Sequence, residues 1–267
     1  MTEWDASAYQ TISGLQQMVA DRHLAHIEFD ESECVLDVGC GNGRITAEIA
    51  ARVPHGSVLG VDPSHNMIEF ARKEYAAARP NLRFEVGDAR SLPYQREFDT
   101  VVSFNALHWV PEQAAALRSI HTALKPDGRA VLHFVPEGER KCIEDVIEDT
   151  CRAPRWKEYF EGHKKPYLHF TPEAYRALAE SNGFRVLDIQ VQDNAWDFGS
   201  RDAFAAFCRV TLADWLDRLP ESDWPAFIND VLDAYAIVAA DKPSERNAFK
   251  FYQLEVTLAL ATATVLR

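Results

Sequence analysis

A glycine-rich turn near the amino terminus constrains the fold of this chain more than any other feature. Residues 34–38 form a short apolar run, glycine occupies positions 39, 41 and 43, and residues 44–53 then carry apolar side chains at helical spacing. A strand that passes through glycines directly into a helix is typical of a βαβ unit. Because glycine lets the backbone approach a ligand that a Cβ would repel, the turn also predicts a ligand-binding site.

The alternation of strands and helices continues after this unit. We expect further strands and helices of the same series at 57–61, 64–78, 82–86, 98–104, 111–124 and 129–134, with the turn Lys125-Pro126-Asp127-Gly128 before the last strand. Four successive βα units predict an α/β fold with a doubly wound, mostly parallel sheet. A helix that opens at Thr171-Pro172 and ends at Gly183, and two later strands at 184–191 and 249–259, complete a predicted sheet of seven strands.

The remaining segments are helical and rich in aromatic residues. They predict helices at 7–27, 201–219 and 222–240, and helical spacing within 137–170. We interpret the chain, 1–267, as a single domain with a core sheet at about 28–136, 184–199 and 249–262, and a helical cap at about 1–27, 137–170 and 200–248. Since open α/β sheets bind ligands at the carboxyl ends of their strands, we expect the cap to lie there.

The composition excludes several classes of partner. The chain has 28 basic and 41 acidic residues, a net charge of −13, and its basic residues form no stripe, so a nucleic acid is not expected. Apolar stretches such as 256–260 are far shorter than the roughly 18 residues that span a bilayer. The amino terminus lacks a basic flank followed by an apolar run, so we expect no secretory signal, no membrane partner and a cytoplasmic protein.

Cysteine and histidine spacing predicts no metal site. The five cysteines include no Cys-x-x-Cys pair, which argues against a disulfide framework and a structural zinc site. None of the nine histidines belongs to a His-Glu-x-x-His pair. We therefore expect reduced thiols and no bound metal.

The order of glycines and acidic residues separates two families of cofactor. A nicotinamide fingerprint would need a third glycine where Arg44 stands. By contrast, the run Asp37-Val38-Gly39-Cys40-Gly41-Asn42-Gly43, with Asp62 and Asp88 at the tips of the next two strands, resembles the class I S-adenosylmethionine-dependent methyltransferases. The resemblance spans residues 33–134 and implies S-adenosyl-L-methionine as the cofactor.

The chemistry of that cofactor suits the residue types. Asp62 can accept hydrogen bonds from both ribose hydroxyls, Asp37 suits the ammonium group, and the helix that begins near Asn42 offers N–H groups to the carboxylate. Asp88 and the backbone of Ala89 can pair with the adenine edge. The expected cofactor-binding residues are Asp37, Gly39, Gly41, Gly43, Asp62, Met67, Asp88, Ala89 and Asn105.

The segment after the fourth strand bears on the methyl acceptor. It reads Asn105-Ala106-Leu107-His108-Trp109-Val110, without the Pro-Pro motif of methyltransferases that act on nucleobases or glutamine, and no Mg²⁺ ligand set can be assembled at the strand tips. Together with Gln16 and Trp156, the segment is similar to juvenile hormone acid O-methyltransferases and, more distantly, to trans-aconitate methyltransferases. Both methylate carboxylates. The resemblance implies that Gln16 and Trp109 hold the acceptor carboxylate, although residues 200–248 align with neither family. The aromatic residues of the cap could enclose the acceptor, and among them we expect Trp156 in the substrate site.

Two classes of small-molecule acceptor remain open. A carboxylate is ionised at pH 7 and needs orientation more than a base, and the Gln16 amide and the Trp109 indole are neutral donors that leave it nucleophilic. A phenol or alcohol would need a base, for which His108 is the candidate. A protein that binds the cofactor without turnover is a third possibility. The sequence does not decide between a monomer and a homodimer.

Overall fold

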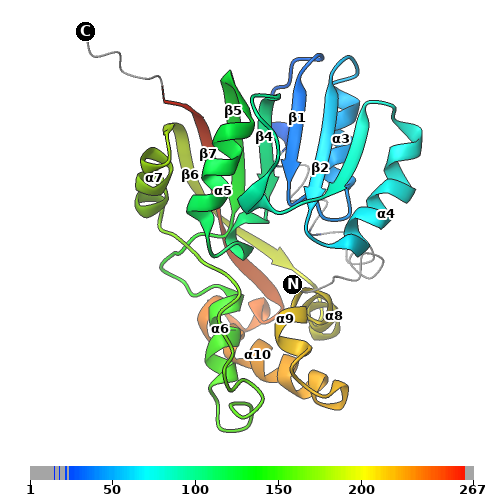
Figure 1. Cartoon of the computed structure of the whole chain (residues 1–267). Coiled ribbons are helices and arrows are strands. Elements are labelled where there is room, and N and C mark those ends of the chain that lie inside the picture. Colours follow the sequence, from blue (N-terminus) through cyan, green and yellow to red (C-terminus); the bar gives the residue numbers. More distant parts are fainter. Residues whose placement is uncertain (1–14, 16–17, 19–21, 23, 262–267) are drawn as a thin grey trace.

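One mixed sheet forms the centre of the molecule (Figure 1). The computed structural model describes residues 15, 18, 22 and 24–261. Among these, seven strands lie side by side in the order β3-β2-β1-β4-β5-β7-β6. Strands β1 to β5 are parallel, whereas β7 is antiparallel to both of its neighbours. The strands are β1 Cys34–Val38, β2 Ser57–Asp62, β3 Leu82–Val86, β4 Phe98–Phe104, β5 Leu124–Phe134, β6 Phe184–Asp197 and β7 Ala248–Leu260. The doubly wound, mostly parallel α/β sheet expected from the sequence is confirmed.

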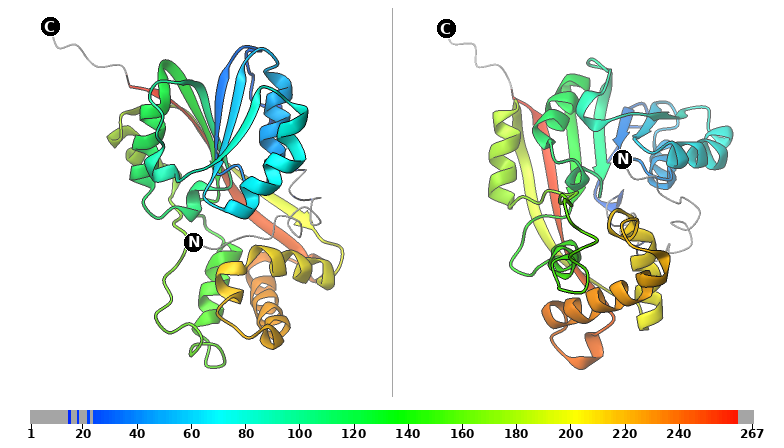
Figure 2. Two further views of the ribbon diagram at one scale, coloured as in Figure 1. Left: turned by 45° about the vertical axis from the view of Figure 1, so that its right-hand side comes forward. Right: turned by 60° about the horizontal axis from the view of Figure 1, so that its bottom comes forward.

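Helices cover both faces of this sheet (Figure 2). Successive residues of a strand point to opposite faces, and Val35 and Leu36 of β1 accordingly belong to two different hydrophobic cores. On the Val35 side the core includes α3 and α4, and on the Leu36 side it includes α5 and α7. These helices are α3 Arg44–Arg52, α4 His65–Tyr75, α5 Gln113–Ala123 and α7 Pro172–Ser181. Short 3-10 turns lie at η1 Ala76–Ala78, η2 Ala89–Ser91, η3 Leu107–Trp109, η4 Glu221–Asp223 and η5 Pro243–Glu245.

The helix boundaries follow the capping residues in the sequence. Ser64 Oγ accepts a hydrogen bond from Met67 N at 3.3 Å, and Thr171 Oγ accepts one from Ala174 N at 3.2 Å. Gly183 ends the α7 turn with a φ of +88°, which only glycine adopts without strain. These contacts satisfy N–H groups that a helix terminus leaves unpaired.

The remaining helices gather at one end of the sheet and form the cap (Figure 1). They are α6 Ile143–Cys151, α8 Arg201–Thr211, α9 Ala213–Leu216 and α10 Trp224–Ala239. Their aromatic side chains, among them Trp215, Phe204 and Phe227, form a third buried core. The long β6–β7 pair extends into this cap, and Phe251 of β7 packs in the cap core while Leu254 packs in the sheet core.

Several expected boundaries were wrong. The Lys125-Pro126-Asp127-Gly128 turn lies inside β5 as an irregularity, because pairing with β4 resumes on both sides of it. Strand β6 runs on to Asp197, since it pairs with β7 over its whole length despite polar side chains. The expected helix at 201–219 breaks at Leu212, and within 137–170 only α6 is an α-helix. Most of the expected helix at 7–27 lies outside the described residues.

Candidate active site

A cavity of about 360 Å³ lies at the carboxyl ends of β1, β2, β3 and β4. Two residues of the cap segments, Pro166 and Asp214, complete its wall. The lining residues come from the tips of the parallel strands, as the switch point of an open α/β sheet predicts. They include Val38, Gly39, Gly41, Asp62, Ser64, Met67, Asp88, Ala89, Arg90, Asn105, Leu107, Trp109, Val110, Pro111 and Glu112.

The glycine turn brings backbone to the cavity wall. Gly39 and Gly41 have φ values of +77° and +53°, in the left-handed region that glycine adopts readily. A Cβ on Gly39 would lie 2.1 Å from the Cβ of Ala106, whereas a Cβ on Gly41 would meet no atom within 4 Å. Gly43 differs from both, because it packs against the Phe84 ring and does not line the cavity. The first two glycines therefore shape the wall, and the third lets α3 approach β3.

Asp62 stands at the tip of β2 with its carboxylate held by backbone. Its Oδ2 accepts a hydrogen bond from Gly41 N at 3.0 Å, and its Oδ1 accepts one from Ser64 N at 2.9 Å. Val61 O accepts from the N–H groups of Gly39 and Cys40 in addition. The acidic tip of β2 and the glycine turn after β1 are thus one hydrogen-bonded unit.

Asp88 pairs with a residue that the sequence analysis did not select. The Arg90 guanidinium donates to both oxygens of Asp88, at 2.6 to 3.0 Å, and this contact lowers the pKa of the Asp88 carboxyl. Arg90 also donates to Glu112 at 3.0 Å. The three side chains form an ion-paired rim of the cavity. Arg90 follows Asp88 by two residues, and this proximity was the only signal in the sequence.

Asp37 lies beneath the glycine turn, 1% exposed. Its Oδ2 accepts a hydrogen bond from Thr46 Oγ1 of α3 at 2.7 Å, while its Oδ1 has no hydrogen-bond partner among the described residues. Burial raises the pKa of Asp37 to about 7, against the lowering effect of the Thr46 hydroxyl and with a smaller contribution from the charge of Asp62. A buried carboxylate with an unpaired oxygen suits a cationic partner.

The turn after β4 and the cap bound the rest of the cavity. Asn105 has a φ of +54° there, and its Oδ1 accepts a hydrogen bond from Gln253 of β7 at 3.0 Å. The Trp109 ring contacts the rings of Tyr167 and Trp215 in edge-on arrangements, with centroids 6.1 and 6.0 Å apart. The wall here is mostly apolar, with the carboxylate of Asp214 at its edge.

Two of the expected acceptor residues, His108 and Trp156, do not line this wall, and a third cannot be placed. Gln16 lies outside the described residues. His108 is buried next to Trp109 and does not line the cavity. Burial lowers the pKa of its imidazole well below 6.5, and the nearby His169 lowers this pKa further. Trp156 lies in the cap core, where its indole donates to Asp230 at 2.8 Å and its ring meets Phe227 edge-on.

The cavity has the features that S-adenosylmethionine requires. Backbone without side chains faces it at Gly41, and an acidic tip stands at Asp62. Asp37 does not line the cavity itself, but it has a buried oxygen without a partner among the described residues directly before the lining residues Val38 and Gly39. A family model described as a methyltransferase domain matches residues 35–128. Trans-aconitate 2-methyltransferase from Enterobacter sp. (strain 638) is 34% identical over 232 residues, which cover 85% of this chain and 86% of that protein. The chain belongs to the class I S-adenosylmethionine-dependent methyltransferases.

A further relative and a solved structure are similar to this chain in sequence and in fold, respectively. Juvenile hormone acid O-methyltransferase from Drosophila melanogaster is 25% identical to this methyltransferase over 280 residues, covering 96% of this chain and 92% of that protein. The fold is also that of phosphoethanolamine N-methyltransferase 2 from Haemonchus contortus, solved in complex with S-adenosyl-L-methionine, with a TM-score of 0.62 at 17% identity over 96% of this chain and 57% of that one. S-adenosylmethionine is therefore the cofactor, and methyl transfer is the reaction. None of the described helices is both long and apolar enough to cross a membrane.

Proposed function

We propose that this methyltransferase esterifies the carboxylate of a small, apolar acid. S-adenosylmethionine supplies an electrophilic methyl group on a sulfonium. Transfer breaks the methyl–sulfur bond and forms a methyl–oxygen bond, so the positive charge of the donor and the negative charge of the acceptor cancel. A partly enclosed, low-dielectric cavity favours such charge cancellation, provided that the two groups are held in line.

In this proposal the methionine end of the cofactor lies against the glycine turn. Gly41 leaves room for it, Gly39 lets the turn after β4 pack against the glycine turn, Gly43 supports the turn from behind, and Asp37 accepts from the ammonium of the cofactor. The partnerless Oδ1 of Asp37 and the open space beside Gly41 support these roles. Asn105, after β4, borders the same end of the cavity.

The nucleoside end lies between the tips of β2 and β3. Asp62 accepts from the ribose hydroxyls, and its fixed carboxylate needs no rearrangement to do so. Met67 contributes an apolar surface to one adenine face, while Asp88 and the backbone of Ala89 pair with the adenine edge. The Arg90 ion pair holds the Asp88 carboxylate at the rim in a single orientation.

The acceptor lies beside Trp109. We assign its indole N–H and the Gln16 amide as donors to the acceptor carboxylate, and the apolar surfaces of Leu107, Val110 and Pro166 as contacts for its body. Trp156 contributes to the acceptor site through its packing in the cap core, because its side chain is 2% exposed and does not line the cavity.

We also propose that the cap and the sheet form one domain, because β7 contributes to the cores of both.

The composition of the cavity wall carries this proposal. The described lining residues include no His, Tyr, Lys or Cys. The basic groups beside the acceptor are carboxylates, those of Asp214 and of Glu112, which pairs with Arg90, and a carboxylate is ordinarily a weaker base than the imidazole that suits a phenol or an alcohol. His108 is the residue suited to that role by type, and it lies behind the wall with a lowered pKa. A carboxylate acceptor arrives ionised and gives up no proton, so a wall without an imidazole, phenol, amine or thiol base is sufficient.

The same wall favours an acid with one carboxylate over a polyacid. Arg90 is the one Lys, Arg or His among the described lining residues, and it is paired with both Asp88 and Glu112. Residues 1–21 contain no Lys or Arg, so that segment supplies no further cation. An acceptor with three carboxylates would lose hydration without gaining ion pairs. We therefore expect a largely apolar monocarboxylic acid.

A pH–rate profile on the best acceptor tests the proposal. With the cofactor saturating, kcat/KM for a medium-chain fatty acid should stay nearly constant from pH 6 to 9, because a carboxylate is ionised throughout this range. Trp109→Phe and Gln16→Ala should each lose about 1 to 3 kcal/mol of acceptor orientation, about 5- to 150-fold in kcat/KM. Trp224→Phe is a matched control, since its indole donates to the Leu219 carbonyl within the cap.

The outcomes separate the two acceptor classes. If a phenol or alcohol is the better acceptor, the rate should instead rise with pH and the rising limb should disappear in His108→Asn. That result would overturn the carboxylate proposal in favour of a phenol or alcohol methyltransferase. A higher kcat/KM for trans-aconitate than for every monocarboxylic acid would refute the expected apolar acceptor alone.

A further inference from the structure

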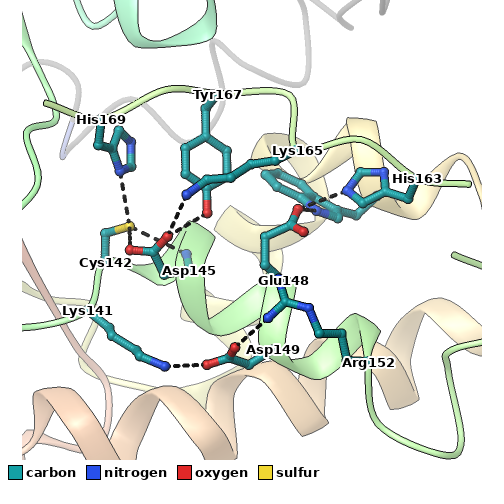
Figure 3. A network of polar contacts seen from close by, with 11 residues as sticks. Lys141, Cys142, Asp145, Glu148, Asp149, Arg152, His163, Lys165, Tyr167 and His169 are labelled. Atoms are coloured by element: carbon teal, nitrogen blue, oxygen red, sulfur yellow. Dashed lines mark hydrogen bonds and ion pairs between the residues drawn. The ribbon is translucent and has the colours of Figure 1, made fainter. Parts of the chain in front are cut away.

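A cluster of metal-binding side chains, Cys142, Glu144 and His169, lies in the cap, and none of the three lines the cavity. Figure 3 shows Cys142 and His169 of this cluster with the neighbouring Asp145. Cys142 is the N-cap of α6, and its Sγ accepts a hydrogen bond from Asp145 N at 3.4 Å. Its sulfur lies 3.6 Å from Nδ1 of His169 and 3.2 Å from Oδ2 of Asp145. Ligand atoms of Cys142, Glu144 and His169 all lie within 4.8 Å of one another, and all three residues are half-buried.

The spacing of sulfur and nitrogen fits a tetrahedral zinc ion. Zinc binds a thiolate at about 2.3 Å and an imidazole nitrogen at about 2.0 to 2.1 Å, so the two atoms lie roughly 3.5 Å apart in a tetrahedral site. The observed Sγ to Nδ1 distance of 3.6 Å agrees with this value. The other nitrogen of His169, Nε2, is buried without a hydrogen-bond partner among the described residues. The contact with Cys142 is thus the polar interaction that orients this ring.

The charges around the cluster also favour a cation. Glu144 and Asp145 bring two carboxylates to the Cys142 thiol. Lys165 pairs with Asp145 Oδ1 at 3.0 Å, and Tyr167 donates to the same oxygen at 2.8 Å (Figure 3). Both of these contacts use one oxygen of Asp145, which leaves Oδ2 facing the sulfur. A divalent ion would replace the thiol proton between that sulfur and its acidic neighbours.

We propose that Cys142, Glu144 and His169 bind a zinc ion, with Asp145 Oδ2 nearest to the fourth position. Thiolate, imidazole and carboxylate together select zinc over magnesium or calcium, which prefer oxygen ligands. Binding converts the Cys142 thiol to a thiolate, forms the sulfur–zinc bond and releases the proton to water. Sequence spacing did not predict this site, because His169 is 27 residues from Cys142 and no motif contains both.

A zinc ion there would fix the segment that leads to the acceptor wall. It would link the start of α6 to residues 163–169, in which Pro166 lines the cavity and Leu168 N donates to His108 O at 2.8 Å. The site would thus act as a structural cross-link within the cap, and it makes no contact with the reacting atoms. This inference does not depend on the identity of the acceptor.

Cobalt titration tests the site directly. Co²⁺ added to the chelator-treated full-length protein should give one equivalent of binding with the thiolate-to-cobalt charge-transfer absorbance, and Zn²⁺ should displace it. Cys142→Ser keeps an oxygen that can cap α6, so it should fold. It should lose the charge-transfer absorbance and bind Co²⁺ at least tenfold more weakly. His169→Gln should weaken binding to a similar extent.

The controls distinguish this site from adventitious thiol binding. Cys34→Ser changes a half-buried thiol on β1, away from the cluster, and should bind Co²⁺ as the parent does. Zn²⁺ should raise the melting temperature of the parent and of Cys34→Ser, but not that of Cys142→Ser. No charge-transfer absorbance in the parent, or the same absorbance in folded Cys142→Ser, would overturn the proposal and leave the cluster a hydrogen-bonded network.

Discussion

Gln253 Nε2 donates a hydrogen bond to Asn105 Oδ1 at 3.0 Å, across 148 residues of sequence. Gln253 is 2% exposed on β7, and Asn105 borders the cavity after β4. Asn105 N also donates to His133 O at 2.7 Å. With its oxygen held by Gln253, the Asn105 amide keeps its Nδ2 donors for other partners. A strand that reaches into the cap thereby sets the orientation of a polar group at the cavity.

Removing this support should weaken ligand binding without abolishing the fold. Gln253→Met keeps the length of the side chain and loses one hydrogen bond, worth about 0.5 to 1.5 kcal/mol, so the affinity for S-adenosylhomocysteine should fall about 2- to 12-fold. Calorimetry measures this affinity. Gln190→Met, at an exposed position on β6, is the control and should bind as the parent does. Unchanged affinity in a folded Gln253→Met would show that the Asn105 orientation is immaterial to the cofactor.

The two glycines of the wall should respond differently to alanine. Both have positive φ, which costs an alanine about 1 to 2 kcal/mol. Gly41→Ala should lose little more stability than this, since its Cβ meets no atom within 4 Å, yet it should bind S-adenosylhomocysteine at least tenfold more weakly because the Cβ occupies open space at the cavity. Gly39→Ala adds an overlap with Ala106 at 2.1 Å and should be the less stable variant by urea denaturation.

A second substitution checks the cause of the Gly39 effect. Ala106→Gly removes the Cβ that the new alanine would meet, so the double variant Gly39→Ala/Ala106→Gly should recover part of the lost free energy of unfolding relative to the sum of the two single changes. Additive effects would mean that backbone strain, and not the overlap, dominates at Gly39.

Asp37 should make cofactor binding depend on pH. Burial raises its pKa to about 7, so the carboxyl is increasingly protonated as the pH falls from 7 to 5. If the ammonium of the cofactor pairs with the carboxylate, the affinity for S-adenosylhomocysteine should fall with decreasing pH over this range, by up to about tenfold per pH unit. Asp37→Asn should bind weakly at all pH values and lose this slope. A parent affinity that is flat from pH 5 to 7 would contradict the pairing.

The same pKa shift has the opposite sign for stability. A carboxyl whose folded pKa lies above its unfolded value of 3.8 favours the folded state most below pH 3.8, and this contribution is lost as the pH rises through about 7. Without cofactor, Asp37 should therefore lower the free energy of unfolding at pH 8 relative to pH 5. Urea denaturation of the parent and of Asp37→Asn at both pH values tests this. The free energy of unfolding of the parent, relative to that of Asp37→Asn, should be lower at pH 8 than at pH 5.

The sheet could be predicted because its signals are local. The glycine turn, the acidic tips of β2 and β3 and the capping residues Ser64 and Thr171 each act within a few residues, and the parallel order follows from the βα alternation. In the cap, helical spacing predicted α8 and α10, but it did not predict the break after α8 or how the cap packs. That packing depends on contacts between distant aromatics, such as the Phe160 and Phe227 rings, whose centroids lie 5.5 Å apart.

The same difference between local signals and tertiary contacts decides which residues of the candidate site could be predicted. Residues that belong to a strand tip, such as Asp62 and Trp109, lie on the cavity wall as expected, although their roles remain proposals. Pro166 and Asp214 complete the wall from the cap and carry no motif, since only tertiary packing brings them there. The aromatic character of Trp156 suggested a contact with substrate, but in a cap with its own core an aromatic residue is as readily a packing residue.

Trp156 should prove to act on stability and not on catalysis. Its indole donates to Asp230 at 2.8 Å, the Arg155 guanidinium lies 4.4 Å from its ring, and the ring is 2% exposed. Trp156→Phe keeps most of the apolar contact but removes a hydrogen bond to a charged acceptor, which should cost about 1.5 to 3 kcal/mol of stability. Because Trp156 does not line the cavity, kcat/KM for the acceptor should change less than twofold at a temperature where the variant is folded. Trp109→Phe should show the reverse pattern, with a small loss of stability and a large loss of kcat/KM. If Trp156→Phe instead lowers kcat/KM tenfold while its melting temperature stays at the parent value, Trp156 contacts the acceptor after all, and the cap must rearrange when the acceptor binds.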